Sequence, residues 1–283
     1  MHPSQTFVEA RSPARHFAIG LARAFGGAVI FGLPLLMTME MWELAQTMPR
    51  ARLALLVAVT LPLLVGLSHV SGFEATFGAR DDIVDAFVAW MVGSFVGAAG
   101  LALLHVIDAR TSAPQIIGMV ALQAVPASIG ALLAQSQFGQ GQDEQSDGER
   151  QSPSGYWNEL LLMLAGALFL AFNVAPTEEM MVIAYRASPW HILALAIVAL
   201  ALMHCFVYAL EFRGQHAPSR DVTMKVEFLR FTLVGYAIAL LVSAYVLWTF
   251  GRFDDTAWVE RVSMTLVLGF PAAVGAAAAR LLL

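Results

Sequence analysis

The sequence is poor in charge. Only 13% of its 283 residues are Asp, Glu, Lys or Arg, whereas 58% belong to the hydrophobic set AVILMFWYC, and the mean hydropathy is +0.69. A water-soluble domain of this size cannot hide so much apolar surface from solvent. The composition therefore excludes a soluble globular protein and indicates an integral membrane protein.

Cysteine and the common catalytic motifs are also scarce. The single thiol, Cys205, excludes a disulfide within the chain, so thiols do not report the redox compartment. The sequence contains no HExxH, no GxSxG, no P-loop and no GxGxxG before a helix. Hydrolases, ATPases and dinucleotide-dependent enzymes need these minimal signals. We therefore expect no enzymatic activity and no cofactor, and nucleic acid is not an expected partner.

Long apolar runs dominate the chain instead. A bilayer core about 30 Å thick requires about 20 apolar residues per helix, and the runs are too long and too aromatic for the alternating strands of a membrane barrel. The sequence predicts an all-α polytopic transmembrane bundle of eight helices, in contact with the lipid bilayer. The predicted helices cover 24–48, 53–73, 83–107, 114–134, 157–185, 189–210, 226–250 and 262–280.

A polar segment divides the chain into two similar halves. Residues 135–156 are rich in Gln, Ser, Gly and acid, which predicts a flexible cytoplasmic linker between 1–134 and 157–283. An offset of 139 residues then places Thr177 on Thr38. Four helices per half would make the repeats parallel, related by a pseudo-two-fold axis along the membrane normal. Further matches pair Gly27 with Gly166, Glu40 with Glu179, Arg80-Asp81 with Arg220-Asp221, and Pro126 with Pro271.

The distribution of Arg and Lys predicts the orientation. More of them fall on the side of the N-terminus than on the opposite side. Both termini are therefore predicted to be cytoplasmic.

Four glutamates lie in apolar sequence. A carboxylate near the bilayer centre costs several kcal/mol, so such residues usually face a bundle interior or an aqueous cavity and are candidates for function. They are Glu40 and Glu43 in the first predicted helix and Glu178 and Glu179 in the fifth.

The repeat singles out Glu40 and Glu179, which would face each other across the axis. Two carboxylates in a low dielectric do not both stay ionised unless a cation lies between them, and otherwise one holds a proton. This predicts a cation or proton site, with a metal ion as one candidate occupant. Thr38, Thr177 and Asn173 would support it with oxygen ligands.

Simpler interpretations of these residues stay open. The acids can be interfacial residues neutralised by Arg50, Arg52 and Arg186. A threonine in a membrane helix often bonds the carbonyl four residues earlier. The methionines around the acids could be copper ligands, although they fill gaps in packing far more often.

Other polar residues also occur within the predicted helices or at their ends. Three histidines inside helices could continue a proton path, or each could be neutral and bonded to a neighbouring helix. Three aspartates could line an inner vestibule, although a helix N-cap is the simpler role for two of them. The histidines are His69, His204 and His105, and the aspartates are Asp81, Asp85 and Asp221, of which Asp81 and Asp221 are the N-cap candidates.

The stretch APTEEMMVIA (175–184), the doubled Thr-x-Glu-Met and the eight helices resemble an uncharacterised family of bacterial integral membrane proteins. The resemblance implies the bacterial inner membrane but no substrate. From the residues themselves we predict a cation pathway for H⁺, K⁺, Na⁺ or Ca²⁺, either a channel or a proton-coupled carrier. The alternatives are a non-transporting sensor or assembly partner and a small-molecule carrier. Small-residue runs in 114–134 and 262–280 suit close helix packing or a homodimer.

Overall fold

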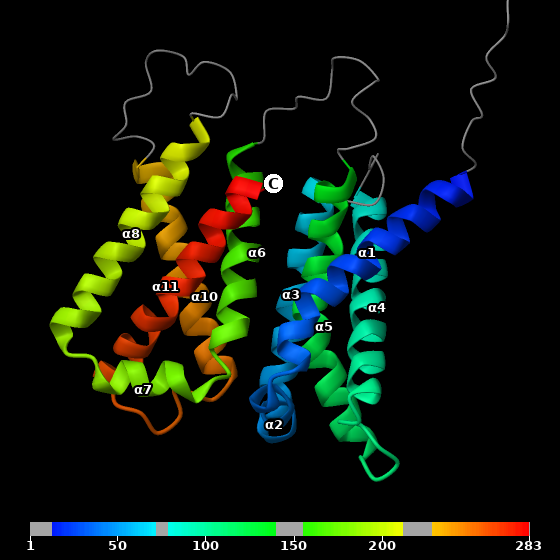
Figure 1. The fold of residues 1–283 in the computed structure, drawn as a ribbon, viewed down its shortest axis with the longest axis horizontal. Helices are drawn as coiled ribbons and strands as arrows, with labels where there is room; N and C mark the ends of the chain where they lie inside the picture. Colours follow the sequence, from blue (N-terminus) through cyan, green and yellow to red (C-terminus); the bar gives the residue numbers. More distant parts are fainter. Residues whose placement is uncertain (1–12, 72–78, 140–154, 212–227, 283) are drawn as a thin grey trace, which may run out of the picture.

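The computed structural model describes residues 13–71, 79–139, 155–211 and 228–282 (Figure 1). These residues form helices and no strand. Among them, eight helices are long and apolar enough to cross a membrane. The predicted all-α fold with eight spans is therefore confirmed.

The two halves have the same order of elements. The first contains the spans α1 (Pro13–Leu36), α3 (Arg50–Ser71), α4 (Ala79–Leu103) and α5 (Ala113–Gly139), with the short helix α2 (Met39–Thr47) after α1. The second contains the spans α6 (Tyr156–Val174), α8 (Pro189–Glu211), α10 (Val234–Thr249) and α11 (Trp258–Leu282). Its short helix α7 (Glu178–Arg186) follows α6, and the π-helical turn η1 (Phe228–Leu233) leads into α10.

The prediction of one continuous helix is wrong for two of the eight ranges. The ranges 24–48 and 157–185 each break in two, because Thr38 (φ −102°, ψ 109°) and Thr177 (φ −71°, ψ 145°) adopt extended backbone. Each threonine stands at the N-cap of the short helix that follows, and glutamate in the first turn favours a new helix start. Figure 1 shows α2 and α7 at the same end of the bundle, with α7 lying across the spans.

The predicted linker is shorter on its N-terminal side than expected. Helix α5 continues to Gly139, so residues 135–139 belong to a helix rather than to the segment 135–156. Residues 140–154 lie outside the described part of the chain.

Helices α5 and α11 form the centre of their halves. Helix α5 packs against α1, α3 and α4, and α11 packs against α6, α8 and α10. The most apolar stretch of α5 is 78% buried, whereas that of α8 is 17% buried. Helix α5 is therefore a core helix, and α8 lies at the periphery of the bundle.

Glycines allow the closest helix crossing in each half. A Cβ on Gly27 of α1 would collide with the carbonyl oxygen of Gly130 on α5, and a Cβ on Gly166 of α6 would collide with that of Gly275 on α11. Small residues of this kind let membrane helices approach backbone to backbone. The two crossings follow the predicted offsets and support the internal repeat.

The helices α4 and α10 end in the same way. Each is followed by a residue in the left-handed conformation, His105 (φ 59°) or Gly251 (φ 74°). The next residue donates its N–H to a carbonyl five residues earlier, which is the Schellman arrangement that closes a helix. These bonds join Val106 to Leu101 and Arg252 to Leu247, each at 2.9 Å.

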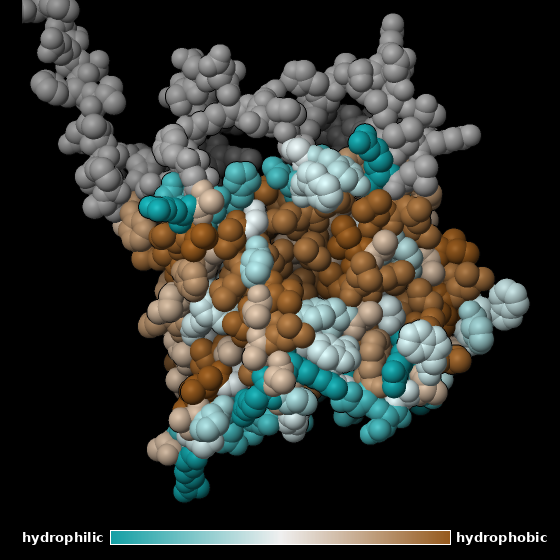
Figure 2. Space-filling view, turned by 180° about the vertical axis from the view of Figure 1, so that it is seen from behind, coloured by the Kyte–Doolittle hydropathy of each residue, from teal (hydrophilic) through white to brown (hydrophobic). Residues whose placement is uncertain are grey.

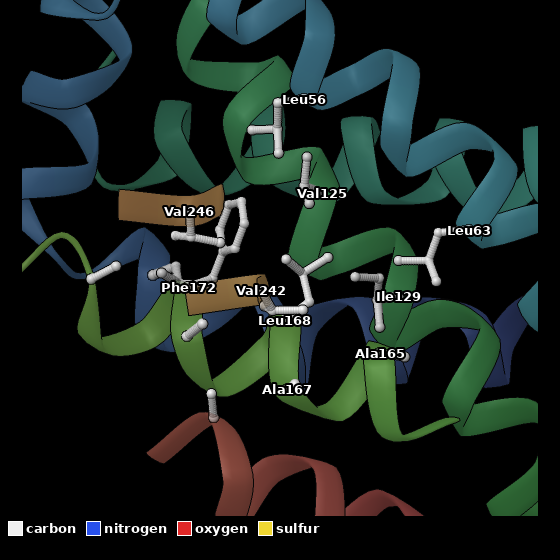
Figure 3. Close-up of a cluster of buried hydrophobic side chains, with 14 of the residues drawn as sticks. Leu56, Leu63, Val125, Ile129, Ala165, Ala167, Leu168, Phe172, Val242 and Val246 are labelled. Carbon is white, nitrogen blue, oxygen red and sulfur yellow. The ribbon is translucent and has the colours of Figure 1, made fainter. Parts of the chain in front are cut away.

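The halves join through unlike faces. Helices α3 and α5 of the first half pack on α6, and α3 also touches α10. Under a two-fold axis α1 and α8 would pack as α3 and α6 do, and among the described residues they do not. The predicted two-fold relation is therefore wrong, and the halves lie side by side. Figure 3 shows the shared core, where Leu56, Leu63, Val125 and Ile129 lie beside Ala165, Leu168, Phe172, Val242 and Val246.

The molecular surface agrees with a membrane setting. In Figure 2 a hydrophobic band covers the middle of the face shown, and hydrophilic residues gather towards the end that carries α2 and α7. Many large apolar side chains of the described residues are exposed, among them Ile30, Phe95, Ile197 and Leu241. A lipid environment accounts for such exposure.

Candidate functional site

The four predicted glutamates do not lie inside membrane helices. Glu40 and Glu43 belong to α2, and Glu178 and Glu179 form the first turn of α7. All four thus lie in short helices of nine residues and not in the eight long spans, so the expectation of four acids within continuous membrane-spanning helices is wrong. Glu40 is half-buried, and the other three are exposed.

A guanidinium from the opposite end of the sequence enters this region. Arg252, in the loop between α10 and α11, donates a hydrogen bond from Nη2 to the carbonyl of Pro176, just before α7. Burial lowers the pKa of Arg252, and the nearby carboxylates of Glu178 and Glu40 act against that change. Arg252 thus interacts with one acid from each short helix.

The structure pairs the acids differently from the sequence. Glu40 and Glu178 interact electrostatically with Arg252, and Glu179 is exposed. The positive charge of Arg252 therefore lies close to two of the four predicted acids. Arg252 was absent from the predicted site residues, because its only signal in the sequence is a position just beyond the end of a span.

The supporting polar groups bond locally. Thr38 Oγ1 donates to the carbonyl of Pro34 at 2.7 Å, and Thr177 Oγ1 donates to that of Val174 at 2.8 Å. Asn173 Nδ2 donates to the carbonyl of Phe169, one turn earlier in the same helix, at 2.8 Å. These side chains therefore bond to nearby backbone carbonyls, as the simpler interpretation of the threonines expects, and not to the glutamates.

A second charged contact joins the two halves at this end. Arg52 on α3 binds Asp254 in the α10–α11 loop through two bonds of 2.8 Å. Arg52 also donates to the carbonyl of Trp248 at 3.0 Å, and its guanidinium lies 5.1 Å from the centre of the Trp248 ring. The hydrogen bond from Arg52 lowers the pKa of Asp254. Nothing in the sequence indicates that Arg52 and Asp254 meet.

A buried carboxylate lies at the opposite end, inside the membrane spans. Asp82 on α4 is 6% exposed, and its Oδ2 lies 3.1 Å from Nδ1 of His69 on α3. Its other oxygen, Oδ1, is buried and has no hydrogen-bond partner. One turn further along α4, Asp85 Oδ2 accepts a bond of 3.4 Å from Ser68. The His69 side chain is 68% exposed, so it connects the buried carboxyl group to the surface.

The other predicted polar residues are dispersed. Asp81 is exposed in the first turn of α4, and Asp221 lies outside the described residues. His204 on α8 is bonded to Thr232 Oγ1 at 3.1 Å, as the neutral interpretation expects. His105 follows the end of α4 and is exposed, so its prediction as a histidine inside a membrane helix is wrong.

The buried face of α4 connects the Asp82 region with polar groups of α5. Asp82 shares this face with Ala86, Ala89, Gly93 and Gly97. Gly93 lies against Ser128, and Gly97 lies against Gln123. Gln123 is 2% exposed, and its Nε2 donates to the carbonyl of Leu35 at 3.0 Å. Its Oε1 is buried and has no hydrogen-bond partner. Among the described residues, the core of this half thus holds two buried acceptor oxygens without a donor, Asp82 Oδ1 and Gln123 Oε1.

Metal ligation finds little support in the part of the chain that is described. No group of three or more His, Cys, Asp or Glu side chains is placed to hold a metal ion there. Glu40 and Glu179, the predicted metal candidates, thus lack a ready set of further ligands of these types.

Eight apolar helices with a continuous packed core and exposed apolar flanks define a polytopic α-helical integral membrane protein. The chain belongs to the family described as "Putative integral membrane protein (DUF2391)", whose model matches residues 20–283. No curated protein and no solved structure matches the chain. The predicted resemblance to an uncharacterised membrane family is confirmed.

Proposed function

We propose that the protein moves protons across the membrane, as a channel or as a proton-coupled cation carrier, through the core of its first half. The observation that carries the proposal is Asp82, a buried carboxylate between membrane helices with one oxygen bonded to His69 and the other unpartnered. Ionisable groups in such positions are expensive and usually mark ion or proton routes.

His69 and Asp82 suit a proton relay. An imidazole ring both donates and accepts protons, and the ring of His69 is exposed at the surface. The 3.1 Å separation between His69 Nδ1 and Asp82 Oδ2 allows transfer between the two groups. A carboxyl group can both accept and release a proton, and the unpartnered Oδ1 of Asp82 offers a second position for it.

The route would continue along the buried face of α4. Ala86 and Ala89 lie on the same buried face, between Asp82 and the glycines that contact α5. Beyond them the unpartnered Gln123 Oε1 can accept a bond from a water or hydronium. Gln123 also contacts the last turn of α1, near the break that leads to α2. An offset of 145 places an apolar residue, Leu268, at the corresponding position of the second half, so we assign the route to the first half.

Arg252 would act on selectivity at the far end. The guanidinium of Arg252, near Glu40 and Glu178, would repel a metal cation, whereas a proton passes along hydrogen bonds. The arrangement thus favours H⁺ over K⁺, Na⁺ and Ca²⁺. This replaces the expectation of an open cation site between Glu40 and Glu179.

The test is proton flux into proteoliposomes that enclose a pH-sensitive dye and carry a valinomycin-imposed potential. We expect Asp82→Asn to abolish flux, Gln123→Leu to reduce it strongly and His69→Gln to slow it. The exposed Glu179→Gln is the matched control and should conduct like wild type. Size-exclusion and circular dichroism profiles confirm that each variant folds.

Two results would overturn the proposal. One is wild-type flux that equals empty liposomes, which would favour the sensor or assembly role. The other is equal flux from wild type, Asp82→Asn and Gln123→Leu. Ion substitution with K⁺, Na⁺ and Ca²⁺ in the same vesicles tests the predicted preference for H⁺.

A further inference from the structure

The joint between the two halves uses one face from each. On the first half the face belongs mainly to α3, and on the second half it belongs mainly to α6. The residues of α6 include Leu161, which lies against Gly66 of α3, and Phe169, whose ring centre lies 4.4 Å from that of Phe31. Because the halves pack through unlike faces, each face has a counterpart elsewhere in the chain.

The counterpart of the α6 face lies on α1 and is uncovered. The offset of 139 residues places Val29, Ile30 and Leu33 at the positions of Leu168, Phe169 and Phe172. These three residues of α1 are 40%, 59% and 47% exposed. An open apolar groove runs along the same face, lined by Ala18, Leu21, Ala22, Phe25, Gly26, Val29 and Ile30.

The counterpart of the α3 face lies on α8 and is also uncovered. Helix α3 begins at Arg50 and α8 at Pro189, which keeps the offset at 139. Leu63 and Gly66 then correspond to Leu202, 37% exposed, and to the exposed Cys205. Figure 1 shows α8 at one side of the bundle and α1 towards the other.

We propose that a second copy of the chain docks its α8 face on the α1 face of the first, repeating the joint between the halves. The interface is head-to-tail, so successive copies form a ring or an open row within the membrane. A second copy fits because the paired positions stay complementary although their residues change.

Size complementarity is retained at the first pair. A Cβ on Gly66 would lie 2.9 Å from Cδ1 of Leu161. At this point of the joint, a glycine without a side chain therefore faces a large leucine. The counterpart of Gly66 is Cys205 on α8, which is larger than glycine, and the counterpart of Leu161 is Ala22 on α1, which is smaller than leucine. Both lie towards the end of the bundle at which α1 begins, so they occur at the same depth.

Charge complementarity is retained at the other end. Arg52 and Asp254 join the halves by an ion pair. The offset of 139 takes Arg52 to His191, and the offset of 146 that relates the two Schellman caps takes Asp254 to Asp108. A base on one copy would thus meet an acid on the next, as they do inside the chain. Both residues are exposed.

The experiment is disulfide cross-linking in native membranes between two differently tagged copies. One copy carries Ala22→Cys with Cys205→Ser, and the other keeps the natural Cys205. We expect an oxidant to link the two tags efficiently. The control replaces Ala22→Cys by Leu241→Cys on α10, a residue that is 70% exposed and outside the proposed contact. The cross-linked fraction should exceed that of the control several-fold and should fall when Asp108→Lys is added to the Ala22→Cys copy.

A lipid-facing α1 would give a different result. Cross-linking of Ala22→Cys no higher than that of Leu241→Cys would overturn the proposal. So would a single-chain mass in nanodiscs, or links confined to Cys205 with Cys205, which indicate a symmetric dimer.

Discussion

Arg52 on α3 and Asp254 in the α10–α11 loop form a two-point ion pair, with both N–O distances at 2.8 Å, that joins the two halves of the bundle. The pair is near the surface, where exposed ion pairs contribute little to stability at neutral pH. Its bidentate geometry and the stacking of Arg52 on Trp248 nevertheless hold the loop that carries Arg252.

The first prediction concerns the pH dependence of this pair. Because Arg52 lowers the pKa of Asp254, the pair contributes to stability above the ordinary aspartate pKa of about 3.9 and loses that contribution as the pH falls through the lower folded value. We expect Asp254→Asn to lower the unfolding temperature in detergent between about pH 5 and 8, where the wild-type Asp254 carboxylate is ionised and paired with Arg52. The difference from wild type should vanish in stronger acid. Asp255→Asn, at an exposed neighbour, is the control, and an equal effect there would contradict the prediction.

The second prediction concerns the crossing of α1 and α5. Gly27→Ala places a methyl group against the backbone of Gly130, so we expect a loss of about 1–3 kcal/mol in the free energy of unfolding. The adjacent Gly26→Ala is the matched control, because nothing lies within 4 Å of its added Cβ. Denaturant titration in mixed micelles measures both. Equal stability of the two variants would show that the helices cross elsewhere.

The third prediction concerns the left-handed residue after α4. His105 has φ 59°, a conformation that costs most residues about 1–2 kcal/mol and glycine little. We expect His105→Gly to raise stability and Gly251→Ala, at the corresponding cap of α10, to lower it. Thermal unfolding in detergent checks both signs. Destabilisation by His105→Gly would mean that the histidine ring makes a contact that offsets the backbone cost.

The fourth prediction concerns Arg252. Replacing it with methionine removes the donor to the Pro176 carbonyl and leaves Glu40 and Glu178 without their cation. We expect Arg252→Met to destabilise the protein and Glu178→Gln to restore part of the loss, in a double-mutant cycle read by thermal unfolding. Arg110→Met, in the exposed α4–α5 loop, is the control. Additive effects of Arg252→Met and Glu178→Gln would show that the two side chains do not interact.

The eight spans could be predicted because each is a run of apolar residues as long as a bilayer is thick. The breaks after α1 and α6 could not be predicted from hydropathy alone. Met41, Leu44 and Ala45 are buried against α5, so α2 is apolar enough to extend the run that precedes it. The signal that separates them is local, a threonine at the N-cap followed by glutamate.

The candidate site could be predicted only in part. His69 was selected from the sequence, but its partner Asp82 adjoins Asp81 and Asp85, and periodicity does not reveal which of these faces the core. Arg252 contacts a residue 76 positions away, and the contact depends on how the α10–α11 loop folds over α7. Such contacts follow from tertiary packing and leave no spacing in the sequence.

The side-by-side joint of the halves gives each half surroundings of its own. In a two-fold molecule, residues at the axis would face their own counterparts, so a carboxylate there would oppose a carboxylate. Here α3 faces α6 while the counterpart faces of α1 and α8 are exposed, and a polar group in one half imposes nothing on the corresponding position of the other. Gln123 can therefore coexist with Leu268 at the corresponding position of the second half.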